Sequence, residues 1–262
     1  MAKLPTLIRE APHIERRIHA ALVEESQRPS ERDGVLGLST IGGCERDLWM
    51  SLNGIPKDPG RDFEGRILAL FGLGHAVEAE VIRLLELAGY KIETRDEDGR
   101  QYRRYWTPPG GKPIGGSIDG IAYLRSRHEP PVLLEIKSSS AKKFEELQGV
   151  GYAAWNPKYA AQIQAYMGAF KLDDSLVVVY CKDDSRIYAE KIRHDPAQSE
   201  ALLEKAHRIV TATELPERPK NPIPGRHKGK DVTRHCAHCK WCDRGDFCFS
   251  PLAELVRVPF DD

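Results

Sequence analysis

The sequence predicts an α/β fold in which helices flank a mixed central sheet. Helix-like and strand-like segments alternate through most of the 262 residues, an order that is typical of helices layered against a sheet. Two strand-like runs, residues 114–124 and 132–139, are apolar apart from a few charged side chains. A chain of this length can bury the core of one domain. We therefore expect a helical lead-in over residues 1–40 and one domain over residues 41–262.

The first half of the chain is expected to form three helices and one strand. A charged helix covers residues 7–31, and a short helix runs from Cys44 to Asn53. Apolar residues recur at helical spacing over residues 67–89, and Gly89 is suited to end that helix. A strand follows over residues 90–94. The Pro-Pro-Gly-Gly sequence that begins at residue 108 predicts a loop before the two charged strands.

The second half is expected to add two helices and a hairpin. Residues 156–170 have helical spacing and place Pro157 in the first turn, where proline is tolerated. The runs 176–180 and 186–192 predict two hairpin strands, and a helix is expected over residues 197–213. No internal repeat or heptad pattern is present.

The charge balance excludes a strongly basic protein, since 39 Lys and Arg residues match 39 Asp and Glu residues. A run of charges is usually a solvated surface. Three basic runs nevertheless flank the charged strands, as a groove that follows phosphates would require. Their members are Arg100, Arg103 and Arg104; Lys142 and Lys143; and Arg218, Lys220, Arg226, Lys228, Lys230 and Arg234.

The charged residues on the two strands predict a metal site. Side chains alternate across a strand, so Glu135 and Lys137 share one face, and Asp119 on the neighbouring run can meet them. Carboxylates are preferred ligands of Mg²⁺ and Mn²⁺, which polarise phosphate and activate water. The alternative is two exposed charges on an amphipathic strand. The apolar run around them disfavours it, because unpaired charges in a covered strand are costly.

This arrangement resembles the PD-(D/E)XK nuclease superfamily, whose signature is an acid, a gap and then (Asp/Glu)-x-Lys. The first acid lies in Gly-Ser-Ile-Asp119-Gly, which is similar to the Gly-x-x-Asp-Gly form of the RecB-like branch rather than to Pro-Asp. The resemblance implies the nuclease core fold, with Asp119, Glu135 and the carbonyl of Ile136 binding Mg²⁺ or Mn²⁺. It implies that Lys137 positions the attacking water.

Two residues of the helix at 156–170 extend the resemblance. Gln162 and Tyr166 are four positions apart and share a face. The RecB-like branch has a similar Gln-x-x-x-Tyr helix after its lysine strand. The resemblance implies that both residues contact the DNA backbone or steady Lys137. The alternative is that Tyr166 is a core residue of an amphipathic helix.

The helix at 67–89 carries a further acid, Glu78, on its apolar stripe. A carboxylate on a buried stripe needs a partner, which a metal or Lys137 would supply. Gly74 and Glu78 resemble the Gly-x-x-x-(His/Glu) motif of the family, whereas His75 does not fit that spacing and is ranked below Glu78. A buried, hydrogen-bonded histidine is an equal alternative for His75. The stripe consists of Ile67, Phe71, Gly74, Glu78, Val81 and Leu85.

Six cysteines suggest a second metal centre. Cys181 follows an apolar strand and is expected to pack as a small apolar residue. No signal peptide or membrane-spanning run is seen, so we expect a cytoplasmic protein of a bacterium or a phage-infected cell, with thiolates as ligands. The tail alone can supply a four-thiolate zinc site. Its cysteines are Cys236, Cys239, Cys242 and Cys248.

The cysteine spacing also resembles the AddB-type recombination nucleases and the CRISPR-adaptation nucleases. These pair one N-terminal cysteine with a C-terminal Cys-x2-Cys-x5-Cys sequence and hold an iron–sulfur cluster. Cys44, Cys239, Cys242 and Cys248 match that pattern, whereas His235 and Cys236 are additional to it. The resemblance implies a [4Fe–4S] cluster that joins the two ends of the domain in a structural role, with Zn²⁺ as the alternative.

Together these features predict a metal-dependent DNA nuclease, an exonuclease that acts on DNA ends in recombination, repair or phage replication. No helicase motif is present, so a recombination or DNA-loading protein is an expected partner, and no membrane is involved. Two alternatives remain: a non-catalytic nucleic-acid-binding module with structural zinc, and a restriction-type endonuclease. Cleavage polarity, strand preference and oligomeric state stay open.

Overall fold

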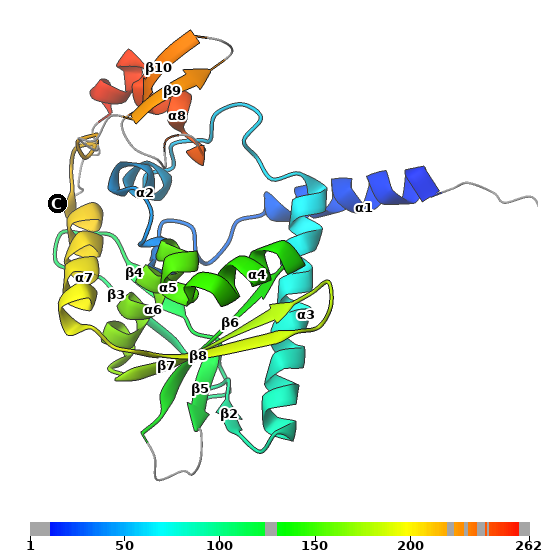
Figure 1. The fold of residues 1–262 in the computed structure, drawn as a ribbon. Coiled ribbons are helices and arrows are strands. Elements are labelled where there is room, and N and C mark those ends of the chain that lie inside the picture. The colour runs from blue at the N-terminus through cyan, green and yellow to red at the C-terminus, as the bar shows by residue number, and fades with distance from the viewer. Residues whose placement is uncertain are drawn as a thin grey trace, which may run out of the picture.

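A mixed five-stranded sheet forms the centre of the molecule (Figure 1). The computed structural model describes residues 11–123, 130–218, 223–227, 230–234, 239 and 241–256. Within the five-stranded sheet, the neighbouring strands β6 and β7 are parallel to each other, and the other neighbouring strands are antiparallel. In spatial order the strands are β2 (Lys91–Glu93), β5 (Gly120–Tyr123), β6 (Val132–Ser139), β7 (Asp174–Cys181) and β8 (Ile187–Arg193).

The strands β6 and β7 are covered on both faces of the sheet, because the side chains that point to either face are mostly apolar. Val177 and Val179 of β7 pack into one apolar cluster with Leu133, while Val178 packs into a second cluster with Leu134. These side chains are almost fully buried. Full burial of one such side chain stabilises a fold by about 1.5–3 kcal/mol. The β6–β7 pair is therefore a rigid base for any residue that β6 carries.

A small second sheet joins the central one through Asp119. Its middle strand β4 ends at Ser117, and β5 of the central sheet begins at Gly120. The run that the sequence predicted as one strand is thus divided between two sheets, which corrects that expectation, and Leu124 lies outside the described residues. In spatial order the small sheet contains β1 (Leu36–Gly37), β4 (Ile114–Ser117) and β3 (Arg103–Trp106).

Helices cover the two faces of the central sheet. On one face, α3 places Val77 and Val81 in the cluster that contains Val178. On the other face, α4, α6 and α7 pack with Val177 and Val179. The helix α1 lies against α3 and projects from the body (Figure 1). The bounds are α1 (Ala11–Ser26), α3 (Gly65–Leu87), α4 (Ala141–Val150), α5 (Tyr152–Trp155), α6 (Pro157–Phe170) and α7 (Pro196–Thr211).

The expected helices and hairpin are present, with bounds shifted by a few residues. The described part of the lead-in corresponds to α1, and the other expected elements correspond to α2 (Glu45–Leu52), α3, α6, α7 and the β7–β8 hairpin. The elements that were not expected are β1, β3, α4 and α5, together with the short elements at 38–40, 223–227, 230–234, 245–249 and 251–255. The prediction that the apolar stripe of α3 is buried is wrong for the first half of this helix. There Phe71 is exposed, and so are the nearby apolar residues Leu70 and Leu73. Only the second half of α3 lies on the sheet.

The C-terminal segment is held against α2 (Glu45–Leu52) and the loop after it. The carboxylate of Asp58 accepts hydrogen bonds from the backbone N–H groups of Asp246 (2.7 Å) and Phe247 (3.1 Å). Arg244 Nε donates to the carbonyl of Ile55 at 2.6 Å. The segment is therefore fixed near the start of the domain.

The remaining elements of this segment are short. Lys220 and Lys228 of the third basic run lie outside the described residues. In the described part of the chain, no helix is both long and apolar enough to cross a membrane. The elements are η1 (Leu38–Thr40), β9 (Ile223–His227), β10 (Lys230–Arg234), α8 (Gly245–Phe249) and η3 (Pro251–Leu255).

Candidate active site

Glu135 and Lys137 lie on one face of β6, and their side chains are hydrogen-bonded. Glu135 is only 1% exposed, and its Oε1 atom accepts from Lys137 Nζ. The lysine side chain is 22% exposed, and its ammonium lies 5.0 Å from the centre of the Tyr159 ring. At this distance a cation is attracted to the face of an aromatic ring. The lysine is therefore held between a carboxylate and an aromatic ring.

Asp119 lies beside this pair because β5 is shorter than β6. The pairing of β5 with β6 stops at Leu134, so the next residues of β6 have no strand partner on that side. Asp119 Oδ2 accepts a 2.7 Å hydrogen bond from the backbone N–H of Ile136. In a strand, the N–H and C=O of one residue point to the same side. The carbonyl of Ile136 thus opens toward Asp119, and its role as a metal ligand stays a prediction.

The helix α6 brings Gln162 and Tyr166 to the same place. Gln162 Nε2 donates to Glu135 Oε1 at 2.8 Å, so its contact is with the acid rather than directly with Lys137. Tyr166 is buried, and its ring lies against β4. A Cβ atom on Gly116 would come within 2.8 Å of the Tyr166 hydroxyl, so only glycine permits this contact. Gln162 and Tyr166 both line the pocket described below.

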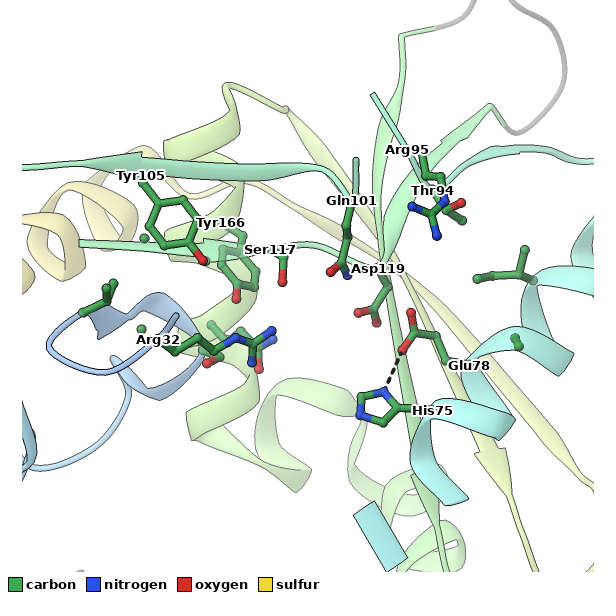
Figure 2. A pocket seen from close by; sticks show the side chains of 18 residues that line it. Arg32, His75, Glu78, Thr94, Arg95, Gln101, Tyr105, Ser117, Asp119 and Tyr166 are labelled. Carbon is green, nitrogen blue, oxygen red and sulfur yellow. Dashed lines mark ion pairs between the residues drawn. The ribbon is translucent and has the colours of Figure 1, made fainter. Parts of the chain in front are cut away.

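Glu78 reaches the site from α3, on the opposite face of the sheet from α6. Figure 2 shows its carboxylate beside that of Asp119, with His75 next to it. His75 Nδ1 lies 3.8 Å from Glu78 Oε2, and the His75 side chain is 85% exposed. The alternative of a buried, hydrogen-bonded histidine is therefore wrong for His75.

The three carboxylates repel one another. Burial raises the pKa of Glu135 to about 7, with Asp119 and Glu78 adding to this effect and Lys137 opposing it. Burial also raises the pKa values of Asp119 and Glu78, and for Glu78 the charge of Asp119 is the next cause. For Lys137, burial alone would lower the pKa, but Glu135 and Asp119 outweigh it and raise the pKa. The site thus carries more negative charge than its lysine compensates.

A pocket of about 510 Å³ opens onto Glu78 and Asp119 (Figure 2). Glu78 and Asp119 lie at one end of it and Arg32 and Tyr166 at the other (Figure 2), and Ser39 also lines it. Arg32 is exposed and has no ion-pair partner among the residues that the structure describes. Cations near phosphate oxygens and acids near a metal are complementary to a phosphodiester substrate.

One buried atom shows that the site is suited to a cation. Glu135 Oε2 is buried and has no hydrogen-bond partner in the described residues. A buried carboxylate oxygen without a partner is costly, and a bound divalent ion would satisfy it. Within the described ranges, no group of three or more His, Cys, Asp or Glu side chains is placed to hold a metal ion as the side chains stand. Ion binding would therefore require the carboxylates to reorient.

A second, small cavity of about 60 Å³ is lined by cysteines, and the expected cysteine cluster stays a prediction. Cys44 is the residue that precedes α2, and Cys239, Cys242 and Cys248 come from the C-terminal segment. Cys181 is buried in β7, as expected for an apolar role. Cys236 and His235 lie outside the described residues. The four cysteines that line the cavity are Cys44, Cys239, Cys242 and Cys248.

Arginine side chains surround the cysteine cavity. Arg46 is buried, and its Nε donates to Cys248 Sγ at 3.2 Å. Arg218 Nη2 donates to the carbonyl of Cys248 at 2.6 Å. Burial raises the pKa of the Cys242 thiol to about 12, and Asp47 adds to this effect. Without a metal this thiol is therefore protonated at neutral pH, whereas a bound metal would hold it as thiolate.

Comparison with known proteins gives only distant structural likenesses. No protein-family model and no curated protein matches the chain. It is similar to the crystal structure of SSO0001, with a TM-score of 0.48 and 16% identity, over 93% of this chain and 98% of that one. An alkaline exonuclease from Laribacter hongkongensis has a TM-score of 0.48 and 18% identity, over 74% of this chain and 90% of that one.

A phage-related exonuclease from Haemophilus somnus is a weaker likeness, with a TM-score of 0.35 and 18% identity. That likeness covers 52% of this chain and 66% of the other. All three TM-scores lie below 0.5.

Several residues of the site were not predicted from the sequence, among them Tyr159, Arg32 and Ser39. Tyr159 lies against Lys137, and Arg32 and Ser39 line the pocket. Helical spacing could have identified Tyr159 from the sequence, because positions 159, 162 and 166 share one face of a helix. Arg32 and Ser39 precede the charged strands by a long stretch of chain, and no local pattern connects them with the acids.

Proposed function

We propose that this protein is a metal-dependent nuclease that hydrolyses phosphodiester bonds in DNA. The observation that carries the proposal is the buried, unpartnered Oε2 of Glu135, located beside Asp119 and Lys137. A carboxylate that only needed Lys137 as a partner would not leave one oxygen buried without a hydrogen bond. The mutual repulsion of Asp119, Glu135 and Glu78 supports the same conclusion, since a divalent cation would neutralise it.

Each residue of the site has a role in this proposal. Asp119, Glu135 and Glu78 hold Mg²⁺ or Mn²⁺, with the carbonyl of Ile136 as a further ligand. The bound ion supplies a Lewis acid that polarises the phosphate and lowers the pKa of water. Lys137 positions the attacking water and stabilises the negative charge that develops on the phosphate.

The helix α6 supports this first set of residues. Gln162 orients Glu135 through its 2.8 Å hydrogen bond. Tyr166 forms the pocket wall, where its hydroxyl can face the substrate backbone. His75, which is exposed beside Glu78, is given only an auxiliary role.

The proposed substrate is a DNA end. Arg32 and Arg95 both line the pocket, Arg95 on the side of the acids and Arg32 across from them (Figure 2), and Arg95 uses its guanidinium to bind the carbonyl of Gly99 at 2.8 Å. Arg32 remains available for a substrate phosphate. We propose an exonuclease that acts in recombination, repair or phage replication, loaded onto DNA by a partner protein. A restriction-type endonuclease is the competing proposal, and it requires cleavage away from ends.

A time course on end-labelled linear DNA and on closed circular DNA tests this function. With Mg²⁺ or Mn²⁺, the linear substrate should shorten progressively while the circle remains intact, and EDTA should stop the reaction. Cleavage of the circle at fixed positions would favour the restriction-type endonuclease. Binding of DNA without any cleavage in either metal would favour a non-catalytic binding module.

We further propose that Cys44, Cys239, Cys242 and Cys248 hold an iron–sulfur cluster, with zinc as the alternative. Their arrangement around one cavity supports a shared metal centre. In a [4Fe–4S] cluster each thiolate binds a different iron, so the four sulfurs lie further apart than around one ion. As the described cysteines stand, they are not placed to hold a single metal ion, so the lining of the cavity is the observation that supports the centre. The centre would join Cys44 to the C-terminal segment and act structurally.

A further inference from the structure

A second groove of about 700 Å³ adjoins the candidate active site. We name it the side groove. It shares Arg32 and Ser39 with the pocket that contains the acids. From there it runs over the loop before α2 and past the start of α6 to the C-terminal segment, where Lys158 also borders the cysteine cavity. The side groove therefore connects the proposed cleavage site with the cysteine-bearing region.

Four cations and three acids line the side groove, and two of the cations and one acid, Asp33, form no ion pair in the part of the chain that the structure describes. Lys57 pairs with Asp243 at 3.0 Å, and Arg244 pairs with Asp47 at 3.1 Å. Arg32 and Lys158 are exposed and have no ion-pair partner in the described part of the chain. Arg32 lies where the side groove meets the candidate active site, and Lys158 lies where the groove meets the cysteine cavity. An anionic polymer with regularly spaced charges is complementary to such an arrangement.

The side groove also presents an aromatic ring. Phe63 is 47% exposed and lines the groove. Its ring is held by Lys57, whose ammonium lies 4.0 Å from the ring centre, and by an edge contact with Phe71 at 5.0 Å. A ring that is fixed in place but exposed is suited to stacking with an unpaired base. A base inside a duplex has no free face for that contact.

We propose that the side groove binds single-stranded nucleic acid that is continuous with the strand in the active site. Arg32 and Lys158 contact its phosphates, and Phe63 stacks on one of its bases. This inference rests on the proposed function for the identity of the strand. It adds the substrate form, an unpaired strand, and the path that this strand follows past the start of α6.

Binding measurements without cleavage test the proposal. Anisotropy of labelled oligothymidylates is recorded in EDTA for a short oligomer of about 4 nucleotides and a longer one of about 12, since a single-strand site of this kind spans about 4–16 nucleotides. Lys158→Ala and Phe63→Leu should each weaken binding of the longer oligomer by about 5–100-fold. Binding of the short oligomer should change by less than a factor of about two. Lys158→Ala should also lower the slope of log affinity against log salt by about one.

Two matched substitutions serve as controls. Lys182→Ala removes a partly exposed cation of the turn between β7 and β8 that lines none of the described pockets, and Tyr90→Leu removes an exposed aromatic ring outside them. Both should bind the longer oligomer as the wild type does. Equal affinity of the groove variants and the wild type for the longer oligomer would overturn the proposal, as would equal losses in the controls. Tighter binding of polyglutamate than of the oligomer would also overturn it.

The outcomes separate this inference from the proposed function. A protein that binds the longer oligomer through Lys158 and Phe63 but cuts no DNA with Mg²⁺ or Mn²⁺ would refute the proposed nuclease activity. It would still support single-strand binding in the side groove. If the wild type cuts DNA and both groove variants bind and cut as it does, single-strand binding in the side groove is refuted and the proposed nuclease activity is not. The metal content of Lys158→Ala is measured as well, because Lys158 also borders the cysteine cavity.

Discussion

Gln162 donates a 2.8 Å hydrogen bond from Nε2 to the same carboxylate oxygen of Glu135 that binds Lys137. One oxygen of Glu135 thus has two donors, while the other oxygen, Oε2, is buried and has no partner among the residues that the structure describes. Gln162 fixes the rotation of the carboxylate and so determines where Oε2 points. It is the residue through which α6 can control metal binding without contacting the metal.

Replacement of Gln162 by alanine should therefore lower the cleavage rate by about 10–100-fold, as is typical when a residue that orients a metal ligand is lost. Metal affinity should fall as well, since Glu135 can then rotate. The measurement is the initial rate of DNA hydrolysis across a Mg²⁺ titration.

Gln164 provides a matched control on the same helix. It is equally buried, but it bonds the carbonyl of Arg193 (3.0 Å) and the N–H of Asp195 (2.8 Å), away from the site. Gln164→Ala should lower the free energy of unfolding by about 1–3 kcal/mol and leave the rate per folded molecule unchanged. Equal rate losses in both variants would reduce Gln162 to a packing role.

Glu78→Gln should raise the Mg²⁺ concentration needed for half-maximal activity by about tenfold or more, because the neutral amide cannot contribute a carboxylate to the ion. His75→Ala should have a smaller effect, since the imidazole is exposed. Glu80→Gln is the control, because Glu80 lies on the same helix and pairs instead with Arg83 at 2.8 Å. A larger loss for His75→Ala than for Glu78→Gln would reverse the assignment.

The stability of the metal-free protein should depend on Glu135. Its pKa rises from an ordinary value of 4.5 to about 7 in the folded chain, so the folded state binds more protons between these values. The free energy of unfolding should then fall as the pH rises through this interval. Thermal unfolding in EDTA from pH 5 to pH 8 measures the slope, and Glu135→Gln should flatten it. The same slope in the variant and the wild type would contradict the prediction.

Protein purified without oxygen should be brown and contain iron and acid-labile sulfide. Cys44→Ser should lose the colour and destabilise the chain by about 4–5 kcal/mol, by analogy with a cross-link that closes a long loop. Cys181→Ala should keep its iron, since that thiol is buried in β7 away from the cavity. One zinc and no iron, with Cys236→Ala more damaging than Cys44→Ser, would exclude the cluster.

Local patterns were sufficient for part of the site. Glu135 and Lys137 share a face because the period of a strand is two, and Gln162 and Tyr166 do so because they are four apart on a helix. These relationships depend on only a few neighbouring residues. The sequence therefore predicted them without knowledge of the tertiary structure.

Other features of the fold and the site depend on contacts between distant segments, which local sequence patterns do not predict. The break between β4 and β5 at Asp119 exists because β4 pairs with β1 and β3, while β5 pairs with β2 and β6. The exposure of Phe71 depends on where α3 leaves the sheet, although its spacing fits the apolar stripe. Arg32 is brought to the pocket by a loop that no periodic pattern describes.

The central claim is that Asp119, Glu135 and Lys137 form a phosphodiesterase site, and Lys137→Ala tests it most directly. The measurement is the initial rate on end-labelled linear DNA with saturating Mg²⁺ or Mn²⁺, for a variant shown to be folded by thermal unfolding. Loss of the ammonium that positions water and stabilises the developing charge should lower the rate by about 10²–10³-fold or more. Glu135→Ala should be equally inactive. A folded Lys137→Ala variant that degrades DNA near the wild-type rate would contradict the account.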